Sequence, residues 1–455
     1  MEKKKPKMGG KLLATLIIFS LVGQIAWVVE NMYFNVFIYE MFGASSDKIS
    51  AMVAASSVVA TLTTILIGAL SDKLGKRKVF ICAGYILWGV SILSFMLVRE
   101  SIIGAIFPAV TSVSAICITI TIVLDCIMTF FGSSANDACF NAWLTDSTTA
   151  ENRGMAEGIN AMMPLMAILV VFGGAMLLPA HEKNPSESGV ISTDTYWSII
   201  FAVIGAIVII IGIVGFFIIK EPKQSTEDNQ NYFKNIIYGF KPSVVKSSPK
   251  LYIYLLLFTV FGISIQVFMP YLIIYYQKAT PLGDGYVLVM VPAIVLAAVF
   301  TAIWGRIYDK LHFNKSIVPS LGLLCVGYIL LFFNYGHTAL LFIGSLLMMC
   351  GYLSANAVFG AVIRDNTPEN KAGMFQGLRI VGQVLIPGIV GPIIGSAVLE
   401  GAKSFTDTDG VERFIPNENI FLGALVVALV LGAMLVGAIF LVRHLEKKRT
   451  TNEGN

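Results

Sequence analysis

Twelve long apolar segments, separated by short polar ones, constrain this chain more than any motif in it. Each is near or above the roughly 20 residues that a helix needs to cross the hydrocarbon core of a bilayer. Only 13% of the residues are charged, whereas soluble domains carry about a quarter, so lipid rather than water must be the main solvent. The predicted membrane-crossing segments are residues 12–39, 49–70, 79–98, 106–144, 155–179, 197–219, 251–276, 286–307, 317–333, 339–363, 373–399 and 420–442.

The segments must be helices or the strands of a closed barrel, because lipid offers no hydrogen-bond partner to exposed backbone groups. Barrel strands are about 10 residues long and alternate in polarity. The segments here are about twice as long and do not alternate. We therefore predict an all-α, multi-pass protein of the cell membrane with twelve transmembrane helices.

Lysine and arginine set the predicted orientation. With both termini in the cytoplasm, about 25 of the 32 basic residues face inward and about six face outward, and Arg379 lies within a helix. The opposite orientation reverses this positive-inside bias. The first apolar segment follows a basic start but is too long for a signal peptide, so we expect it to be an uncleaved helix.

The polar residues do not suggest an enzyme. The six cysteines fall within predicted helices and show neither a disulfide framework nor metal-ligand spacing. We find no pairing of nucleophile and base and no ATP-binding loop. The sequence therefore predicts no metal, no cofactor and no nucleic-acid partner, and the bilayer is its main surrounding.

An internal repeat divides the chain into two halves. Residues 68–73 and 305–310 both read Gly-x-x-x-Asp-Lys, at an offset of 237 positions, and residues 32–39 resemble 269–276 at the same offset. Two six-helix halves related by a repeat are a transporter architecture, with the solute site between the halves near the bilayer midplane. We predict an N-terminal half over 1–220, a cytoplasmic linker over 221–250 and a C-terminal half over 251–455.

The first copy of the repeated loop carries a known pattern. The sequence from Gly68 through Asp72, Gly75 and Arg77 closely resembles the loop signature of the major facilitator superfamily, with a degenerate copy that contains Asp309. The resemblance spans the whole chain and implies the twelve-helix fold of that superfamily. It also implies that carboxylates and cations at these helix ends latch one conformation, although such residues can also be plain positive-inside anchors.

The predicted latch extends beyond this loop. It includes a second inner loop and the inner end of the fifth helix, where Glu157 is also expected to join a charge network with Arg153. The latch residues are Gly68, Asp72, Gly75, Arg77, Asp309, Asp146, Arg153 and Glu157.

A narrower resemblance points to a substrate class. Residues 23–31 and 136–146 look like the glycoside–pentoside–hexuronide cation symporters, nearest their sucrose-transporter-like branch, which implies sugar uptake coupled to a cation. Melibiose-type members carry two sodium-binding carboxylates where this chain has Ala60 and Thr64, which favours protons here. Plant sucrose carriers have a helix 4 carboxylate where this chain has Phe130.

Three carboxylates inside predicted helices are the coupling-ion candidates. A charged side chain in the bilayer costs at least about 2.5–3.5 kcal/mol, so each is a functional hypothesis. Glu30 on helix 1 and Asp125 on helix 4 lie at similar depths, and no residue within one helical turn explains either. Asp137 lies three turns further along helix 4, where an ion pair with Arg379 is an equal alternative. Desolvation can raise the pKa of a buried carboxylate to neutrality, which suits proton coupling.

Other polar and aromatic residues inside the helices could bind a hydroxyl-rich solute. Amides supply hydrogen bonds and indoles can stack on sugar rings, although each residue can also serve only in helix packing. The substrate-binding candidates are Trp27, Asn31, Asn136, Asn141, Gln266, Asn356, Arg379 and Gln383. Further along helix 11, the glycines of residues 388–395 indicate a close-packing face.

Three functions fit these observations. The favoured one is a secondary active transporter that carries a sugar or glycoside with a proton by alternating access. The second is a lipid or drug carrier of the same fold, which apolar cavity walls would favour. The third is a non-transporting membrane sensor, which the short linker and the short tail after residue 442 disfavour.

Overall fold

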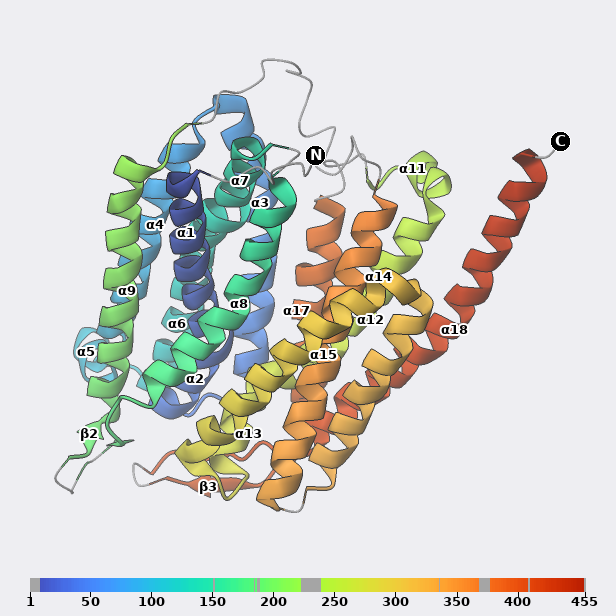
Figure 1. Cartoon of the computed structure of the whole chain (residues 1–455). Helices are drawn as coiled ribbons and strands as arrows, with labels where there is room; N and C mark the ends of the chain where they lie inside the picture. Colours follow the sequence, from blue (N-terminus) through green and yellow to red (C-terminus); the bar gives the residue numbers. More distant parts are fainter. Residues whose placement is uncertain are drawn as a thin grey trace. The chain divides into compact units, whose positions relative to one another are not determined.

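The computed structural model describes residues 9–149, 152–183, 185, 189–221, 239–334, 336–367, 377–407 and 410–453, with the backbone alone at 72, 153, 154, 157, 309 and 443–453. Twelve helices in this described part are long and apolar enough to cross a membrane. The all-α prediction is confirmed, since the strands among these residues are just two short pairs, β1–β2 and β3–β4. Figure 1 shows the whole chain.

The chain forms two compact units. The first comprises Met1–Tyr232 together with Ser404–Phe414, and the second comprises Phe233–Lys403 and Ile415–Asn455. Most of the predicted linker, at 222–238, lies outside the described residues.

Six membrane-crossing helices build the first unit, and α1 packs between α8 and α9 while α3 packs on α6. Its elements are α1 (Gly10–Val28), η1 (Val29–Tyr33), α2 (Phe34–Phe42), α3 (Ser46–Leu74), α4 (Arg77–Ser94), η2 (Phe95–Leu97), α5 (Glu100–Ile106), α6 (Val113–Gly132), η3 (Ser133–Phe140), α7 (Asn141–Ser147), α8 (Arg153–Ala175), β1 (His181–Glu182), β2 (Ile191–Ser192) and α9 (Thr193–Ile218).

The second unit repeats this plan. Its elements are α11 (Pro242–Ser247), α12 (Pro249–Phe268), η4 (Met269–Tyr271), α13 (Leu272–Lys278), η5 (Gly283–Tyr286), α14 (Val287–Phe332), α15 (Thr338–Asn366), η6 (Val381–Leu385), α17 (Ile386–Val398) and α18 (Asn419–Glu453). The antiparallel pair β3 (Ser404–Thr406) and β4 (Glu412–Phe414) lies between α17 and α18 in sequence but groups with the first unit.

The glycines of α17 pack as predicted. A Cβ atom added to Gly391 would lie 2.4 Å from the Gln266 side chain, and one added to Gly395 would lie 2.2 Å from the Val267 carbonyl oxygen. Both contacts are with α12, so hydrogen in place of a side chain lets the two helix backbones approach closely.

The fourth membrane helix begins later than the predicted residue 106. Its helix α6 starts at Val113, whereas α5 ends at Ile106. Pro108 lies between them, and proline disfavours helical conformation in the residue before it. Ser112 then caps α6 by accepting a hydrogen bond from the Ala115 N–H at 3.3 Å.

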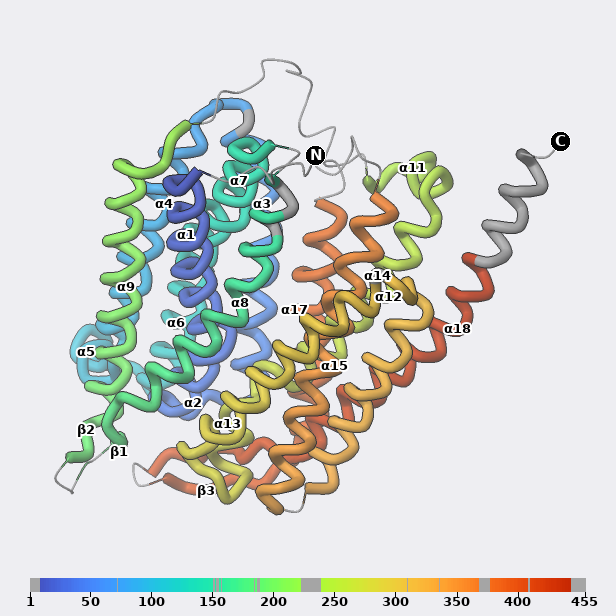
Figure 2. The backbone as a smooth tube through the Cα atoms, in the orientation of Figure 1, coloured from blue at the N-terminus to red at the C-terminus, as the bar shows by residue number. Residues whose placement is uncertain are grey.

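The eighth and ninth membrane helices are joined without a loop. Residues of α14 are helical on both sides of His312, whose φ of 57° and ψ of −176° break the helix. Figure 2 shows the backbone of α14 reversing at a sharp bend. His312 lies 237 positions after Gly75, which has a φ of 65°. The repeat therefore preserves a positive φ at the same position of both connections, although ψ is 23° at Gly75 and −176° at His312.

Candidate functional site

The three candidate carboxylates lie within the first unit. Glu30 is 7% exposed in η1, and Asp125 is 2% exposed in α6. Asp137 is half-buried in η3. Glu30 lies within electrostatic range of both other carboxylates. The structure therefore brings together the carboxylates that the sequence placed on the first and fourth membrane helices.

Few polar groups lie beside Glu30 and Asp125. Thr129 donates its hydroxyl to Glu30 Oε1 at 2.7 Å. The Ser56 hydroxyl of α3, which donates to the Val53 carbonyl at 3.2 Å, lies near Asp125. Glu30 Oε2 and Asp125 Oδ1 are buried and have no hydrogen-bond partner within the described part of the chain. No described lysine or arginine forms an ion pair with either. A buried charge without a partner is costly, so such a pair is suited to bind a proton or another small cation.

Asp137 has more hydrogen-bond donors. The Ser133 hydroxyl donates to its Oδ2 at 3.2 Å, and the Asn136 amide donates to its Oδ1 at 3.3 Å. The indole nitrogen of Trp27 is buried near the same carboxylate and has no hydrogen-bond partner among the described residues. Asp137 is thus better solvated by protein groups than Glu30 or Asp125.

Candidate residues coincide with breaks in α-helical geometry. Glu30 and Asn31 lie in the π-helical segment η1, and Asn136 and Asp137 lie in the π-helical segment η3. The second unit has one such segment in its described residues, η6, and it contains Gln383. A π segment inserts an extra residue into a helix and is frequent at functional sites, because it redirects side chains and exposes carbonyl groups.

The amide candidates of the first unit differ in exposure. Asn31 and Asn141 are exposed, and each donates its amide to the carbonyl four residues earlier, at 2.8 Å and 3.2 Å. Asn136 is 3% exposed. It accepts a hydrogen bond from the Tyr85 hydroxyl at 3.0 Å, and its oxygen would lie 2.5 Å from a Cβ atom at Gly23. Asn136 therefore holds helices together as well as orienting Asp137.

The tryptophans of this region each pack against another aromatic ring. Trp27 is half-buried and its ring lies 5.1 Å from that of Trp88. Trp143 of α7 is 3% exposed and stacks on Phe140, and its indole donates to the Lys220 carbonyl at 2.9 Å. Trp143 is consequently a packing residue in this arrangement, whereas Trp27 retains an exposed edge.

The candidates of the second unit come from α12, α15, and the segment around η6. Gln266 and Gln383 are half-buried, and Asn356 and Arg379 are exposed. Arg379 Nε donates to Gln383 Oε1 at 3.2 Å. Gln383 Nε2 is buried and without a hydrogen-bond partner in the described part of this unit. An unsatisfied amide beside a cation can donate hydrogen bonds to an oxygen-rich solute.

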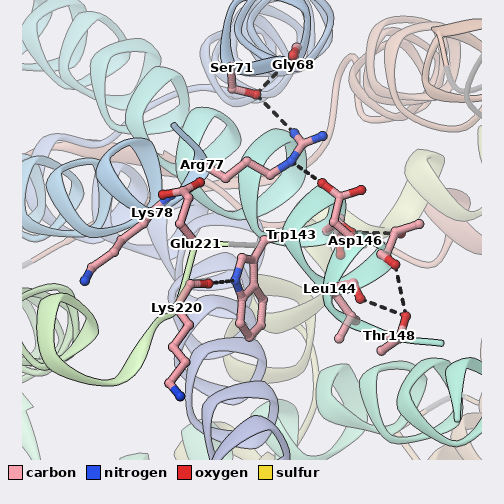
Figure 3. A network of polar contacts seen from close by, with 12 residues as sticks. Gly68, Ser71, Arg77, Lys78, Trp143, Leu144, Asp146, Thr148, Lys220 and Glu221 are labelled. Carbon is pink, nitrogen blue, oxygen red and sulfur yellow. Dashed lines mark hydrogen bonds and ion pairs between the residues drawn. The ribbon is translucent and has the colours of Figure 1, made fainter. Parts of the chain in front are cut away.

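Some of the residues predicted to form the latch contact one another at the end of the first unit where α3 meets α4 (Figure 3). Arg77 is 7% exposed. Its Nε donates to Asp146 Oδ2 at 2.5 Å, and its Nη1 lies 3.3 Å from Ser71 Oγ. Ser71 in turn donates to the Gly68 carbonyl at 3.0 Å. The loop signature thus ties α3 to α4 and α7.

Two neighbouring residues extend this network. The Lys78 backbone N–H faces the Glu221 carboxylate, with Oε2 at 3.2 Å. Gly75 supplies the tight turn between the helices, with its N–H donating to the Ser71 carbonyl at 2.9 Å. The side chains of Asp72, Arg153, Glu157 and Asp309 lie outside the described residues.

The opposite end of the first unit holds a cluster that the sequence did not reveal. Glu40 Oε2 accepts a hydrogen bond from the Trp197 indole at 3.1 Å and pairs with His181 Nε2 at 3.2 Å. Arg413 is 2% exposed against the same helix end. These partners come from loops far apart in the sequence, and no spacing rule connects them.

Comparisons with known proteins agree with this architecture. The family model described as Major Facilitator Superfamily matches residues 14–333 and 287–455. No curated protein matches the sequence.

Several solved structures share the fold at low sequence identity. The nucleoside transporter NupG is 13% identical with a TM-score of 0.67, and the match covers 94% of this chain and 99% of that one. A bacterial homologue of the human lysosomal transporter Spinster is 15% identical with a TM-score of 0.67, covering 94% and 96%. The xylose transporter XylE from E. coli is 14% identical with a TM-score of 0.66, covering 95% and 98%.

Proposed function

We propose that this chain, which belongs to the major facilitator superfamily, carries a hydroxyl-rich solute of the sugar or glycoside class across the cell membrane together with a proton. The family and the fold indicate a multi-pass membrane transporter. The solute class and the coupling ion are inferred from the polar groups inside its two units.

The Glu30–Asp125 pair carries the proposal. Both carboxylates are buried, each has a single hydroxyl neighbour, and each keeps one oxygen without a partner in the described structure. Binding one proton removes one negative charge from such a pair and so lowers the cost of burying it. A carrier that exposes this pair to alternate sides would couple solute movement to a proton gradient.

Helix α3 lacks the carboxylates that bind sodium in the symporters it resembles. The positions of the two sodium carboxylates of melibiose-type symporters fall at Ala60 and Thr64 of α3, which supply no negative charge. Sodium prefers several oxygen ligands, including charged ones. This composition supports the proton as the coupling ion.

Solute class is supported by the amides and the cation outside the carboxylate pair. Asn31, Asn141 and Asn356 are exposed, and Arg379 stands beside Gln383. Amides and guanidinium groups can bind several hydroxyl groups at once, which suits sugars and the ribose of nucleosides. The solved structures of similar fold include a nucleoside transporter and a xylose transporter.

The test is uptake by liposomes reconstituted with the purified protein. Radiolabelled sucrose, xylose and uridine are offered under a pH gradient without sodium, and under a sodium gradient at constant pH. We expect accumulation of at least one solute under the pH gradient, abolished by a protonophore. Accumulation that requires sodium at constant pH contradicts the coupling proposal.

A second measurement on the same purified protein distinguishes a sugar transporter from a lipid carrier. A thermal-shift screen against the three solutes and a lysophospholipid measures stabilisation by binding. Stabilisation by the lysophospholipid alone, with no uptake of the three solutes, would replace the sugar proposal with that of a lipid carrier.

A further inference from the structure

The β3–β4 hairpin belongs to one unit by its contacts and is joined in sequence to helices of the other. Residues 404–414 group with the first unit, yet both ends of the hairpin continue into helices of the second unit. The connections are short, at 399–403 on one side and 415–418 on the other. The hairpin is therefore a bridge from α17 and α18 to the first unit.

Arg413 fastens this bridge to the last turn of α2. Its Nη2 donates to the Glu40 carbonyl at 2.9 Å and its Nε donates to the Tyr39 carbonyl at 3.3 Å. Its Nη1 pairs with Asp407 Oδ2 at 2.6 Å within the hairpin. The last carbonyls of a helix lack helical partners and carry its negative dipole end, so a planar guanidinium is a fitting cap.

Two further contacts complete the docking. The Tyr39 hydroxyl donates to the Phe414 carbonyl at 2.7 Å, and the two rings meet edge to face at 5.4 Å. Val411 covers Gly43, where a Cβ atom would lie 2.4 Å from Val411 Cγ1. Gly43 has a φ of 64° and ends α2, with its N–H donating to the Tyr39 carbonyl at 3.0 Å.

We propose that the β3–β4 hairpin forms a releasable strap, with Arg413 as its clasp, which ties α17 and α18 of the second unit to the last turn of α2 in the first. A docked hairpin with connections of five and four residues limits how far the halves can separate there, because an extended residue spans at most about 3.6 Å. Alternating access opens and closes each end in turn. The docked strap therefore couples movement of α17 and α18 to the end of α2.

Release of the strap can be measured without knowing the solute. A cysteine at Val411→Cys lies against Gly43 when the strap is docked and becomes accessible when it leaves. The protein is placed in nanodiscs, where both ends are open to reagent, and labelled with a membrane-impermeant maleimide. The parent chain without Val411→Cys gives the background from its six native thiols.

Arg413→Gln should speed this labelling about tenfold, because glutamine loses the charge and the two-pronged contact with the helix end. Arg99→Gln is the matched control. Arg99 binds the Met96 carbonyl at 3.0 Å and the Ser198 hydroxyl at 2.5 Å in the same unit and shows no contact with the hairpin. Equal labelling rates in Arg413→Gln and Arg99→Gln overturn the clasp. If Arg413→Gln does not fold, Arg413→Lys keeps the charge but not the planar fork, and should speed labelling several-fold.

A disulfide tests whether release belongs to the transport cycle. The built Cβ of Gly43 lies 3.8 Å from the Val411 Cβ, which matches disulfide geometry. In Gly43→Cys/Val411→Cys, oxidation should abolish sucrose, xylose and uridine uptake under a pH gradient, and a reductant should restore it. Any strain from cysteine at Gly43 is common to both forms, so the reduced protein is the control.

Full uptake by the oxidised protein overturns the strap and makes the hairpin a fixed part of the first half. The labelling result needs no solute, and the parent's own uptake is measured alongside. Failure of the strap is therefore distinguishable from failure of the proposed function.

Discussion

Asp125 is the residue on which proton coupling can be separated from solute binding. Its amide variant Asp125→Asn resembles a permanently protonated carboxyl group. We expect Asp125→Asn to exchange solute across the membrane in counterflow but to lose accumulation under a pH gradient, because the site can no longer release a proton. Counterflow, active uptake and melting temperature on the one variant give the answer.

Other outcomes would reassign the residue. Loss of both exchange and accumulation would make Asp125 a solute ligand. A lower melting temperature with loss of both would make it structural. Retained accumulation in Asp125→Asn, with uncoupled exchange in Glu30→Gln, would move the proton to Glu30, whose only described hydrogen-bond donor is Thr129.

The ion pair between Arg77 and Asp146 gives a second test on single side chains. Their side chains are 9% and 33% exposed, so the pair should be worth about 1 kcal/mol after solvent screening. A double-mutant cycle with Arg77→Gln and Asp146→Asn, measured by thermal unfolding in detergent, should show coupling of that size. The exposed pair Lys48–Asp47 is the matched control and should show almost none. Additive effects at Arg77 and Asp146 would remove the pair from the latch.

Only some of the site residues can be predicted from the sequence. Glu30, Asp125 and Asp137 can be predicted from sequence because a charge inside a long apolar segment is costly and therefore conspicuous. Their hydrogen-bond partners cannot, because Thr129 and Ser56 are common residues in membrane helices. The clasp at Arg413 is equally hidden, since an arginine in a polar loop looks like any exposed charge until the hairpin is seen packed on α2.

Among the helices and turns, His312 carries visible strain. Its φ of 57° with ψ of −176° is a conformation that glycine adopts readily and other residues only at a cost of about 1–3 kcal/mol. His312→Gly should therefore raise stability by about 1 kcal/mol after the flexibility of glycine in the unfolded chain is subtracted. A thermal-shift measurement checks this.

The control for His312→Gly lies one residue earlier. Leu311 is exposed and helical, so Leu311→Gly should lower stability by about 1 kcal/mol. If both substitutions lower the melting temperature equally, then the turn at His312 is not strained.

The membrane helices could largely be predicted from the sequence. The twelve predicted segments correspond to the twelve membrane-length helices, because apolar length is set by bilayer thickness. The start of the fourth was misplaced because residues 106–110 are apolar enough to read as membrane helix, although Pro108 breaks it. The π-helical segments η1 and η3 were not predicted, since no periodicity marks one extra residue in a turn.

Across the whole molecule, the repeat is more than a sequence pattern. It gives Gly75 and His312 a positive φ at the same position of two helix connections, and it places a helix break at η1 and another at η4. In the described residues of the corresponding loop of the first half, β1 and β2 form a parallel pair, unlike the antiparallel hairpin of β3 and β4. The strap is therefore an addition to a duplicated plan, and the repeat could not have predicted it.

The orientation of the whole chain in the membrane is the final prediction. Lys48 is exposed in the first turn of α3, and Lys76 is exposed two residues after the other end of that helix. The positive-inside bias places Lys76 in the cytoplasm, among about 25 basic residues, and Lys48 outside, among about six. On intact cells, an impermeant maleimide should label Lys48→Cys at once and Lys76→Cys only after lysis, each against the parent chain. The reverse result would invert the orientation and put the strap, which follows the eleventh helix, on the cytoplasmic side. With the predicted result, Arg413 becomes an outward-side basic residue that is 2% exposed, held by the end of α2 rather than by water.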